Sequence, residues 1–175
     1  ADISLKGSEK TSTGEQDRNI EWPWAVWTNG KKLVVTSTRS PSILIWNTIP
    51  TKNNEEPDVV IKLDDFGTPR TIGSDGTNLI IGDHNAFKKD RGNFFWKTFP
   101  TQNNQKYDFF MKNALGGDIS NIATGEIMWG PTFTGEGKFI VLSDKIYIWN
   151  KFPENENDTP DFSIGDRMQG GDGSG

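Results

Sequence analysis

The sequence predicts an all-β fold of β-propeller blades, with three four-stranded antiparallel blades in the chain. Three observations predict this fold class. One segment is written three times at nearly constant spacing, the apolar runs are short and rich in β-branched and aromatic residues, and no stretch keeps a helical periodicity. A repeat of roughly 50 residues is typical of stacked or radially arranged units. A β-sandwich with accidental self-similarity is the alternative, but it does not explain the constant spacing.

Each copy of the repeat is centred on a tryptophan that an apolar residue and a proline follow. The tryptophans are Trp46, Trp96 and Trp149, which are separated by 50 and 53 residues. Shortly after each tryptophan comes an aspartate that leads a short apolar strand, and a further copy of that element opens the chain. The four aspartates are Asp2, Asp58, Asp108 and Asp161. We expect the three tryptophans to be structurally equivalent and buried, because each stands in the same local context.

The first unit is expected to contain strands near residues 24–28, 33–36, 43–46 and 58–62. Asn29-Gly30 lies between the first two, and Asn-Gly is the strongest short signal for a β-hairpin. Both faces of these strands are apolar, which indicates a sheet covered on both sides, as a propeller blade is by its neighbours.

The other two units repeat this plan. In the second, Asp75-Gly76 supplies the hairpin turn and strands are expected near 79–81, 94–96 and 108–112. The third has a turn at Gly135-Glu136-Gly137, and its strands are expected near 139–142, 146–149 and 161–164. We therefore divide the chain into a three-blade unit over residues 1–165 and a flexible Gly-rich tail over 166–175. The approximate blade limits are 1–56, 57–106 and 107–165.

The phrase Ile45-Trp46-Asn47-Thr48-Ile49-Pro50-Thr51, with Asn-rich sequence and an Asp-led strand after it, resembles the NHL-like propeller repeats of bacterial and archaeal proteins. The resemblance covers residues 1 to about 165. It implies a propeller fold but no particular function, because the family includes scaffolds, ligand binders and some enzymes. Family blades commonly carry an Asp-x-Gly-Asn-Asn-Arg loop before the third strand. This chain has residues 37–41, 83–85 and 143–144 in those places.

Three blades do not close a ring, since propellers have roughly 4–8 blades. We therefore expect a head-to-tail homodimer that forms one six-bladed ring, and the alternative is that a longer propeller supplies the remaining blades. The strand led by Asp161 is expected to complete the ring across the interface. Residues 1–6 are then displaced or paired elsewhere.

Composition excludes several classes of function. The net charge of −5 argues against nucleic-acid binding, and no apolar run is long enough for a membrane span. The chain has no cysteine, which excludes disulfides and zinc–sulfur sites. We expect no cofactor, although calcium is possible because Asp and Asn are plentiful. Abundant Asn, Thr and Trp favour an exported protein, extracellular or periplasmic, while the compartment itself stays open.

Candidate binding residues lie in the loops that differ between copies. Trp22 and Trp24 enter the innermost strand of the first blade, and Trp129 enters the equivalent strand of the third. Aromatic side chains at the mouth of a channel can stack on a sugar or another flat ligand, or they can simply fill the channel. Arg70 occupies the corresponding region of the second blade.

Asp83 and His84 form the other candidate pair, at a strand end on the loop-rich face. His84 is the single histidine, so catalysis would need carboxylates from other blades. An exposed loop histidine is the simpler interpretation, and we assign no catalytic or metal-binding residue. We therefore predict a non-catalytic propeller scaffold that binds a protein partner or a small polar ligand on its loop-rich face. The alternatives are a propeller-type hydrolase or lyase with a divalent ion at the channel, and a structural repeat segment of a larger surface or assembly protein.

Overall fold

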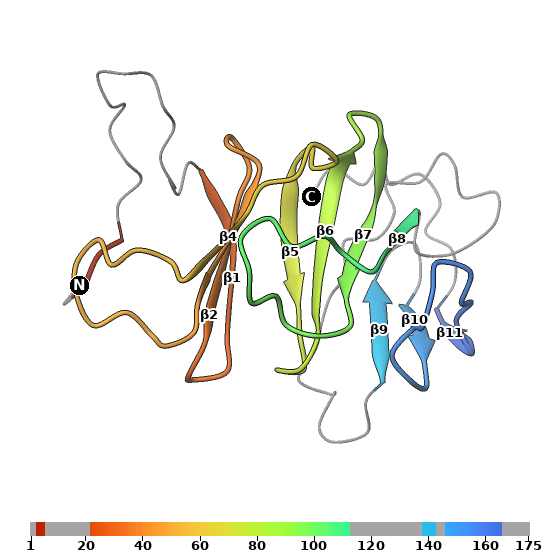
Figure 1. Ribbon diagram of the computed structural model, residues 1–175. Coiled ribbons are helices and arrows are strands. Elements are labelled where there is room, and N and C mark those ends of the chain that lie inside the picture. Colours follow the sequence, from red (N-terminus) through yellow and green to blue (C-terminus); the bar gives the residue numbers. More distant parts are fainter. Residues whose placement is uncertain (1–2, 6–21, 113–137, 143–145, 166–175) are drawn as a thin grey trace.

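The computed structural model describes residues 3–5, 22–112, 138–142 and 146–165. These residues form three antiparallel sheets of four, four and three strands (Figure 1). The prediction of an all-β fold is confirmed. Within the described segments there is no helix of the length and apolar character needed to cross a bilayer.

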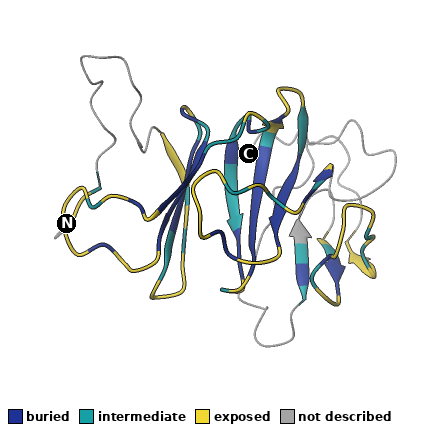
Figure 2. Cartoon of the chain, viewed as in Figure 1, coloured by how far each residue is buried: buried dark blue, intermediate teal, exposed yellow. Residues whose placement is uncertain are grey.

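The first sheet contains four strands in sequential order, each paired with the next along the chain. They are β1 (Pro23–Thr28), β2 (Leu33–Ser37), β3 (Ser42–Trp46) and β4 (Val59–Ile61). Every residue of β3 is buried, because this strand has a neighbour on each side and a covered surface on each face. β1 is the edge strand and is largely exposed, as Figure 2 shows.

The second sheet repeats this order with β5 (Pro69–Gly73), β6 (Leu79–Ala86), β7 (Asp90–Trp96) and β8 (Phe109–Lys112). The third sheet contains β9 (Phe139–Leu142), β10 (Ile146–Trp149) and β11 (Phe162–Ile164). The fourth strand that the sequence predicts for this sheet falls in residues 113–137, outside the described residues. Each sheet ends with its Asp-led strand. A blade as delimited from the sequence therefore combines the last strand of one sheet with the first three strands of the next.

The same turn joins the first two strands of the first sheet and the first two strands of the second sheet. The Asn29 side-chain oxygen accepts hydrogen bonds from the backbone N–H groups of Lys31 and Lys32, at 3.0 and 2.8 Å. Asp75 does the same for the two equivalent residues of the second sheet. Gly30 and Gly76 follow with φ of 84° and 96°, a conformation in which glycine has no steric cost. The turn signals in the sequence therefore act through the same bonds in both hairpins.

The repeated tryptophans are equivalent and buried, as predicted. Each indole N–H donates to the backbone carbonyl nine residues later: Trp46 to Glu55 at 2.9 Å, Trp96 to Gln105 at 3.1 Å and Trp149 to Asp158 at 3.3 Å. The backbone N–H after each tryptophan donates to the aspartate that leads the last strand: Asn47 to Asp58, Lys97 to Asp108 and Asn150 to Asp161, each at 2.7 Å. These bonds close the loop before the last strand of every sheet.

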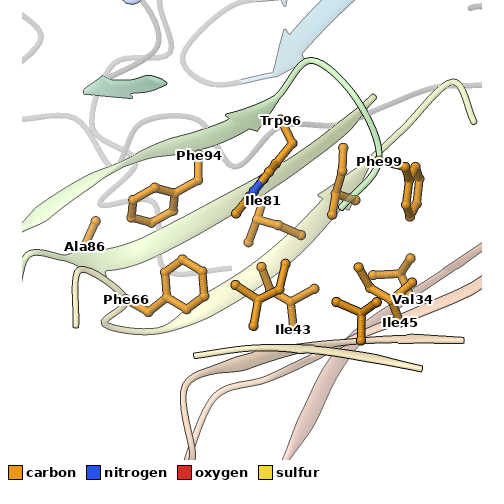
Figure 3. Packing of buried hydrophobic residues seen from close by; sticks show 12 residues of the cluster. Val34, Ile43, Ile45, Phe66, Ile81, Ala86, Phe94, Trp96 and Phe99 are labelled. Carbon is orange, nitrogen blue, oxygen red and sulfur yellow. The ribbon is translucent and has the colours of Figure 1, made fainter. Parts of the chain in front are cut away.

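The main core lies between the first two sheets (Figure 3). Ile43 and Ile45 of the first sheet face Ile81, Phe94 and Trp96 of the second. A second core joins the second and third sheets, where Phe95 and Phe109 lie against Phe139 and Trp149. The sheets are thus joined face to face through apolar side chains.

Residues 82–92, which separate the strands expected near 79–81 and 94–96, are largely strand. β6 continues to Ala86 and β7 begins at Asp90. Phe87 and Lys88 form the turn between them, with φ of 53° and 67°. Neither residue type favours positive φ, so the sequence carries no turn signal here. Packing supplies the compensation, because the Phe87 ring lies edge-on to Phe110 with centroids 5.0 Å apart.

Candidate functional site

The first strands of the first two sheets lie next to each other, and we call the surface of β1 and β5 the inner edge. Trp24 of β1 is 51% exposed there, and Arg70 of β5 stacks on it, with the guanidinium carbon 4.5 Å from the ring centroid. A guanidinium over an indole face is a favourable cation–π geometry. The structure therefore brings together two of the side chains that the sequence identified in separate units.

A buried hydroxyl fixes the spacing of the two strands. Thr36 Oγ1 accepts the backbone N–H of Ala25 at 3.1 Å and donates to the backbone carbonyl of Arg70 at 3.0 Å. Thr36 belongs to β2, so a single side chain links three strands. Because these bonds hold both backbones, the stacked pair stands on a rigid support.

Trp22 lies directly before β1 and is 69% exposed. Its backbone has φ of 58°, a strained value for a bulky residue. The Trp22 carbonyl accepts both the backbone N–H and the hydroxyl of Thr38, each at 3.2 Å. The strained backbone is thus held in place while the indole stays in solvent, an arrangement suited to contact with another molecule.

Asp83 has a structural position instead. It is buried, and its carboxylate accepts three backbone N–H groups, from Gly67 at 3.0 Å, Thr68 at 2.8 Å and Asn85 at 2.8 Å. Burial raises the pKa of Asp83 above its ordinary value, and this outweighs the opposing effect of the three N–H donors and of nearby Arg70. The carboxylate is therefore surrounded by protein donors and organises the loop before β5.

Gly67 allows that loop to approach the β6–β7 hairpin. A Cβ at this position would lie 1.8 Å from the backbone oxygen of Asn85. No larger residue fits without a shift of the loop, so the bond from Gly67 to Asp83 depends on glycine here.

His84 is directed to a different neighbour. Its Nε2 lies 2.9 Å from an Arg91 guanidinium nitrogen, and its backbone N–H donates to the Thr68 carbonyl at 3.1 Å. Because arginine can only donate, His84 Nε2 accepts, which places the imidazole proton on Nδ1. The described residues contain no group of three or more His, Asp or Glu side chains that could hold a metal ion. Trp129, the remaining candidate, lies outside the described residues.

Sequence reasoning missed one repeated feature, the asparagine turn, formed by Asn53-Asn54 and again by Asn103-Asn104. In the second copy, Asn103 accepts the backbone N–H of Val60 at 2.8 Å, and Asn104 accepts that of Lys62 at 2.8 Å and donates its own N–H to the Val60 carbonyl at 3.0 Å. The turn of one sheet therefore binds the open edge of the preceding sheet. The signal was available, because Asn-Asn recurs in the first two repeats and Glu156-Asn157 stands in the third.

One face of the third sheet is open to solvent. Ile146, Phe162 and Ile164 are 38, 45 and 54% exposed. Their counterparts in the first sheet, Ile43, Val59 and Ile61, are at most 2% exposed against the second sheet. All three residues of β11 are exposed, as Figure 2 shows, whereas all three residues of β4 are buried. The same pattern of apolar residues is thus covered at one end of the array and uncovered at the other.

Comparison with known proteins adds no relative. A scan against protein-family models, a search of curated proteins and a search of solved structures each found no match. The resemblance to NHL-like repeats therefore stays a prediction.

Proposed function

We propose that the chain is a non-catalytic propeller-type binding module whose inner edge holds a small polar ligand with a flat apolar face, such as a sugar ring. The observation that carries the proposal is the stacking of Arg70 on exposed Trp24. Arg70 covers one face of the indole, and the part of the ring that stays exposed offers a flat apolar surface to the ligand. A guanidinium in this position can donate hydrogen bonds to hydroxyl or carboxylate oxygens. Exposed Trp22 adds a second aromatic surface.

A small ligand fits this surface better than a protein does. The surface consists of the stacked Trp24 and Arg70 side chains on two neighbouring strands, with Trp22 directly before β1. A stable protein interface takes about 800 Å² from each partner. We assign no chemistry to it, because Asp83 is bonded to three backbone N–H groups and His84 to Arg91. His84 is the residue on which the hydrolase or lyase alternative depends.

The test is an NMR titration that follows the indole N–H signals of the tryptophans. The probes are soluble hexasaccharides of glucose, of N-acetylglucosamine and of galacturonic acid. We expect one of them to shift the signals of Trp22 and Trp24, whereas Trp46, Trp96 and Trp149 stay unchanged because their N–H groups are bonded to backbone.

Trp24→Ala and Arg70→Ala should each weaken that binding at least tenfold, about 1.4 kcal/mol. Ile49→Ala is the matched control, because Ile49 is also an exposed apolar residue but lies in the loop after β3. If no probe shifts any exposed tryptophan, or if Trp24→Ala binds as tightly as the wild type, the ligand-binding proposal fails.

A second proposal concerns the partner. The exposed face of the third sheet favours a further blade as its neighbour, and we propose that a second copy of the chain supplies it in a six-bladed ring of NHL-like type. Burial of such apolar area contributes about 25 cal/mol per Å². Sedimentation equilibrium should give twice the 19.6 kDa of the chain. A monomer at all concentrations would leave a longer propeller as the source of the missing blades.

A further inference from the structure

We infer that the asparagine turn Asn53-Asn54 of one copy binds strand β11 of a second copy, which takes the place now held by Ile3–Leu5. This inference rests on the proposed homodimer and identifies the elements that would join it. It follows from two incomplete contacts, one at each end of the array, that match one another.

At the first end, an asparagine turn holds a segment, Ile3–Leu5, that belongs to no sheet. The Ser4 N–H donates to the Asn53 side-chain oxygen at 2.8 Å, and the Asn54 N–H donates to the Ser4 carbonyl at 3.0 Å. Val60 makes the same two bonds with Asn103-Asn104, at 2.8 and 3.0 Å. Ser4 thus occupies the position of the last strand of a preceding sheet. Yet residues 3–5 pair with no strand in the described part of the chain.

At the other end, β11 belongs to a sheet, but no asparagine turn among the described residues binds it. Its sequence Asp161-Phe162-Ser163-Ile164 has the pattern of Asp2-Ile3-Ser4-Leu5, with serine at the position that the turn binds. Ser163 lies opposite Tyr147 of β10, as Val60 lies opposite Leu44 of β3. In this register the Ser163 N–H and carbonyl point away from β10, as those of Val60 point away from β3. With respect to the residues that the structure describes, the outer edge of β11 is therefore open to the same pair of bonds.

The side chains agree with the backbone. Val59 and Ile61 of β4 lie in the same core as Phe94 and Trp96 of the next sheet. The equivalent surface of the first sheet contains Leu44 and Trp46, and Leu5 now lies against it. Phe162 and Ile164 would take the places of Ile3 and Leu5, and they would gain the apolar cover that they lack. Both are larger than, or as large as, the side chains of residues 3–5 that they replace.

Two single-cysteine variants test the contact, since the chain has no cysteine of its own. Asn53→Cys and Ser163→Cys are prepared separately, mixed, and treated with a short bismaleimide. We expect a cross-linked heterodimer joined at positions 53 and 163 by mass spectrometry. Asn103→Cys is the matched control, because β4 of the same chain already occupies that turn, and it should not cross-link to Ser163→Cys.

A pair of proline variants gives opposite expectations. Ser163→Pro removes the N–H that the turn would bind but no bond between β10 and β11, and prolines are tolerated at outer strand edges. It should weaken dimerisation roughly fivefold for each contact, or about 25-fold for the two contacts of a closed dimer. Ser4→Pro removes the N–H of the competing segment and should strengthen dimerisation by up to similar factors.

Three results would overturn the inference in distinguishable ways. A wild-type dimer without the 53–163 cross-link means that another surface joins the copies, and the homodimer proposal survives. The same holds if Ser4→Pro weakens the dimer and Ser163→Pro does not, because the N-terminal segment is then the one that closes the ring. A wild-type monomer at every concentration removes both the homodimer and the strand exchange.

Discussion

The same pattern of apolar residues is covered at the contact between the first two sheets and exposed at the open face of the third sheet. At the first contact, Ile43, Ile45, Val59 and Ile61 are covered by the second sheet. Their counterparts in the third sheet are Ile146, Ile148, Phe162 and Ile164, and only Ile148 is buried. Yet the tryptophan and aspartate bonds within the repeat are the same at both places.

The difference separates what the repeat itself determines from what a neighbour must add. The bonds from tryptophan to carbonyl and from backbone to aspartate are local, so they form in every copy. Burial of the sheet face requires the next sheet, so the face is buried only where a further sheet covers it. Exposure of an apolar set that is elsewhere buried is therefore the observation on which the proposed second copy rests.

The largest effect is expected from truncating a repeated tryptophan inside the covered contact. Trp96→Ala should lower the free energy of unfolding by about 3–5 kcal/mol, because it removes a fully buried indole and leaves a cavity beside Phe66 and Tyr107. Urea unfolding measures this loss. Trp24→Ala, which truncates an exposed indole, should cost less than about 1 kcal/mol. Equal losses would contradict the division between buried repeat tryptophans and exposed inner-edge tryptophans.

The comparison itself is tested by one substitution at two equivalent positions. Phe109→Ala should cost about 3–4 kcal/mol, because Phe109 is buried and stacks on Phe95 with centroids 4.5 Å apart. Phe162→Ala at the open face should cost about 1 kcal/mol or less in the monomer. Unfolding at a concentration low enough to keep the chain monomeric gives both values. A large loss for Phe162→Ala would mean that this face is covered within one chain.

Sequence reasoning recovered what is encoded locally. The hairpins at Asn29-Gly30 and Asp75-Gly76 and the equivalence of the three tryptophans all follow from residues that recur at fixed spacing. The turn at Phe87-Lys88 was missed because neither residue favours positive φ and only its packing on Phe110 holds it. Repetition therefore predicts the described sheets well and predicts the extended β6–β7 hairpin poorly.

The candidate site shows the same division. Trp24 and Arg70 were identified separately, but their stacking depends on the approach of β1 to β5, which no local pattern states. Asp83 looked like a partner for His84 because the two are adjacent in sequence. In a strand, adjacent side chains point to opposite faces, so the two could not act together on one ligand.

Removing the Asp83 carboxylate should have the next largest effect. Asp83→Ala leaves three backbone N–H groups without their acceptor and should cost about 2–3 kcal/mol. Asp83→Asn should cost about 1 kcal/mol, because one oxygen accepts from both Thr68 and Asn85 and an amide oxygen can keep those two bonds. Thermal unfolding distinguishes the two variants. Equal losses would mean that the charge of Asp83, and not its hydrogen bonds, holds the loop before β5.

The smallest effect concerns Tyr107, which lies beside the covered contact and donates its hydroxyl to Asp65 at 2.9 Å. Burial and the bond to Asp65 raise the pKa of Tyr107 from 10.0 to about 12. For Asp65, burial would raise the pKa, but the bonds from Lys106 and Tyr107 together lower it. The neutral phenol of Tyr107 and the charged carboxylate of Asp65 therefore stabilise each other.

The sign of the pH dependence follows from the raised pKa. The stabilisation by neutral Tyr107 is complete below pH 10, the ordinary pKa, and it is lost as the pH rises through about 12. Tyr147→Phe leaves Tyr107 as the sole tyrosine of the two in the chain, so phenolate absorbance reports its ionisation alone. In that background, Asp65→Asn should lower the pKa of Tyr107 part of the way back towards 10, because burial remains. A Tyr107 that titrates near 10 with Asp65 intact would contradict both the burial of the phenol and its bond to Asp65, and Tyr107 would then not link the loop before β8 to the loop before β5.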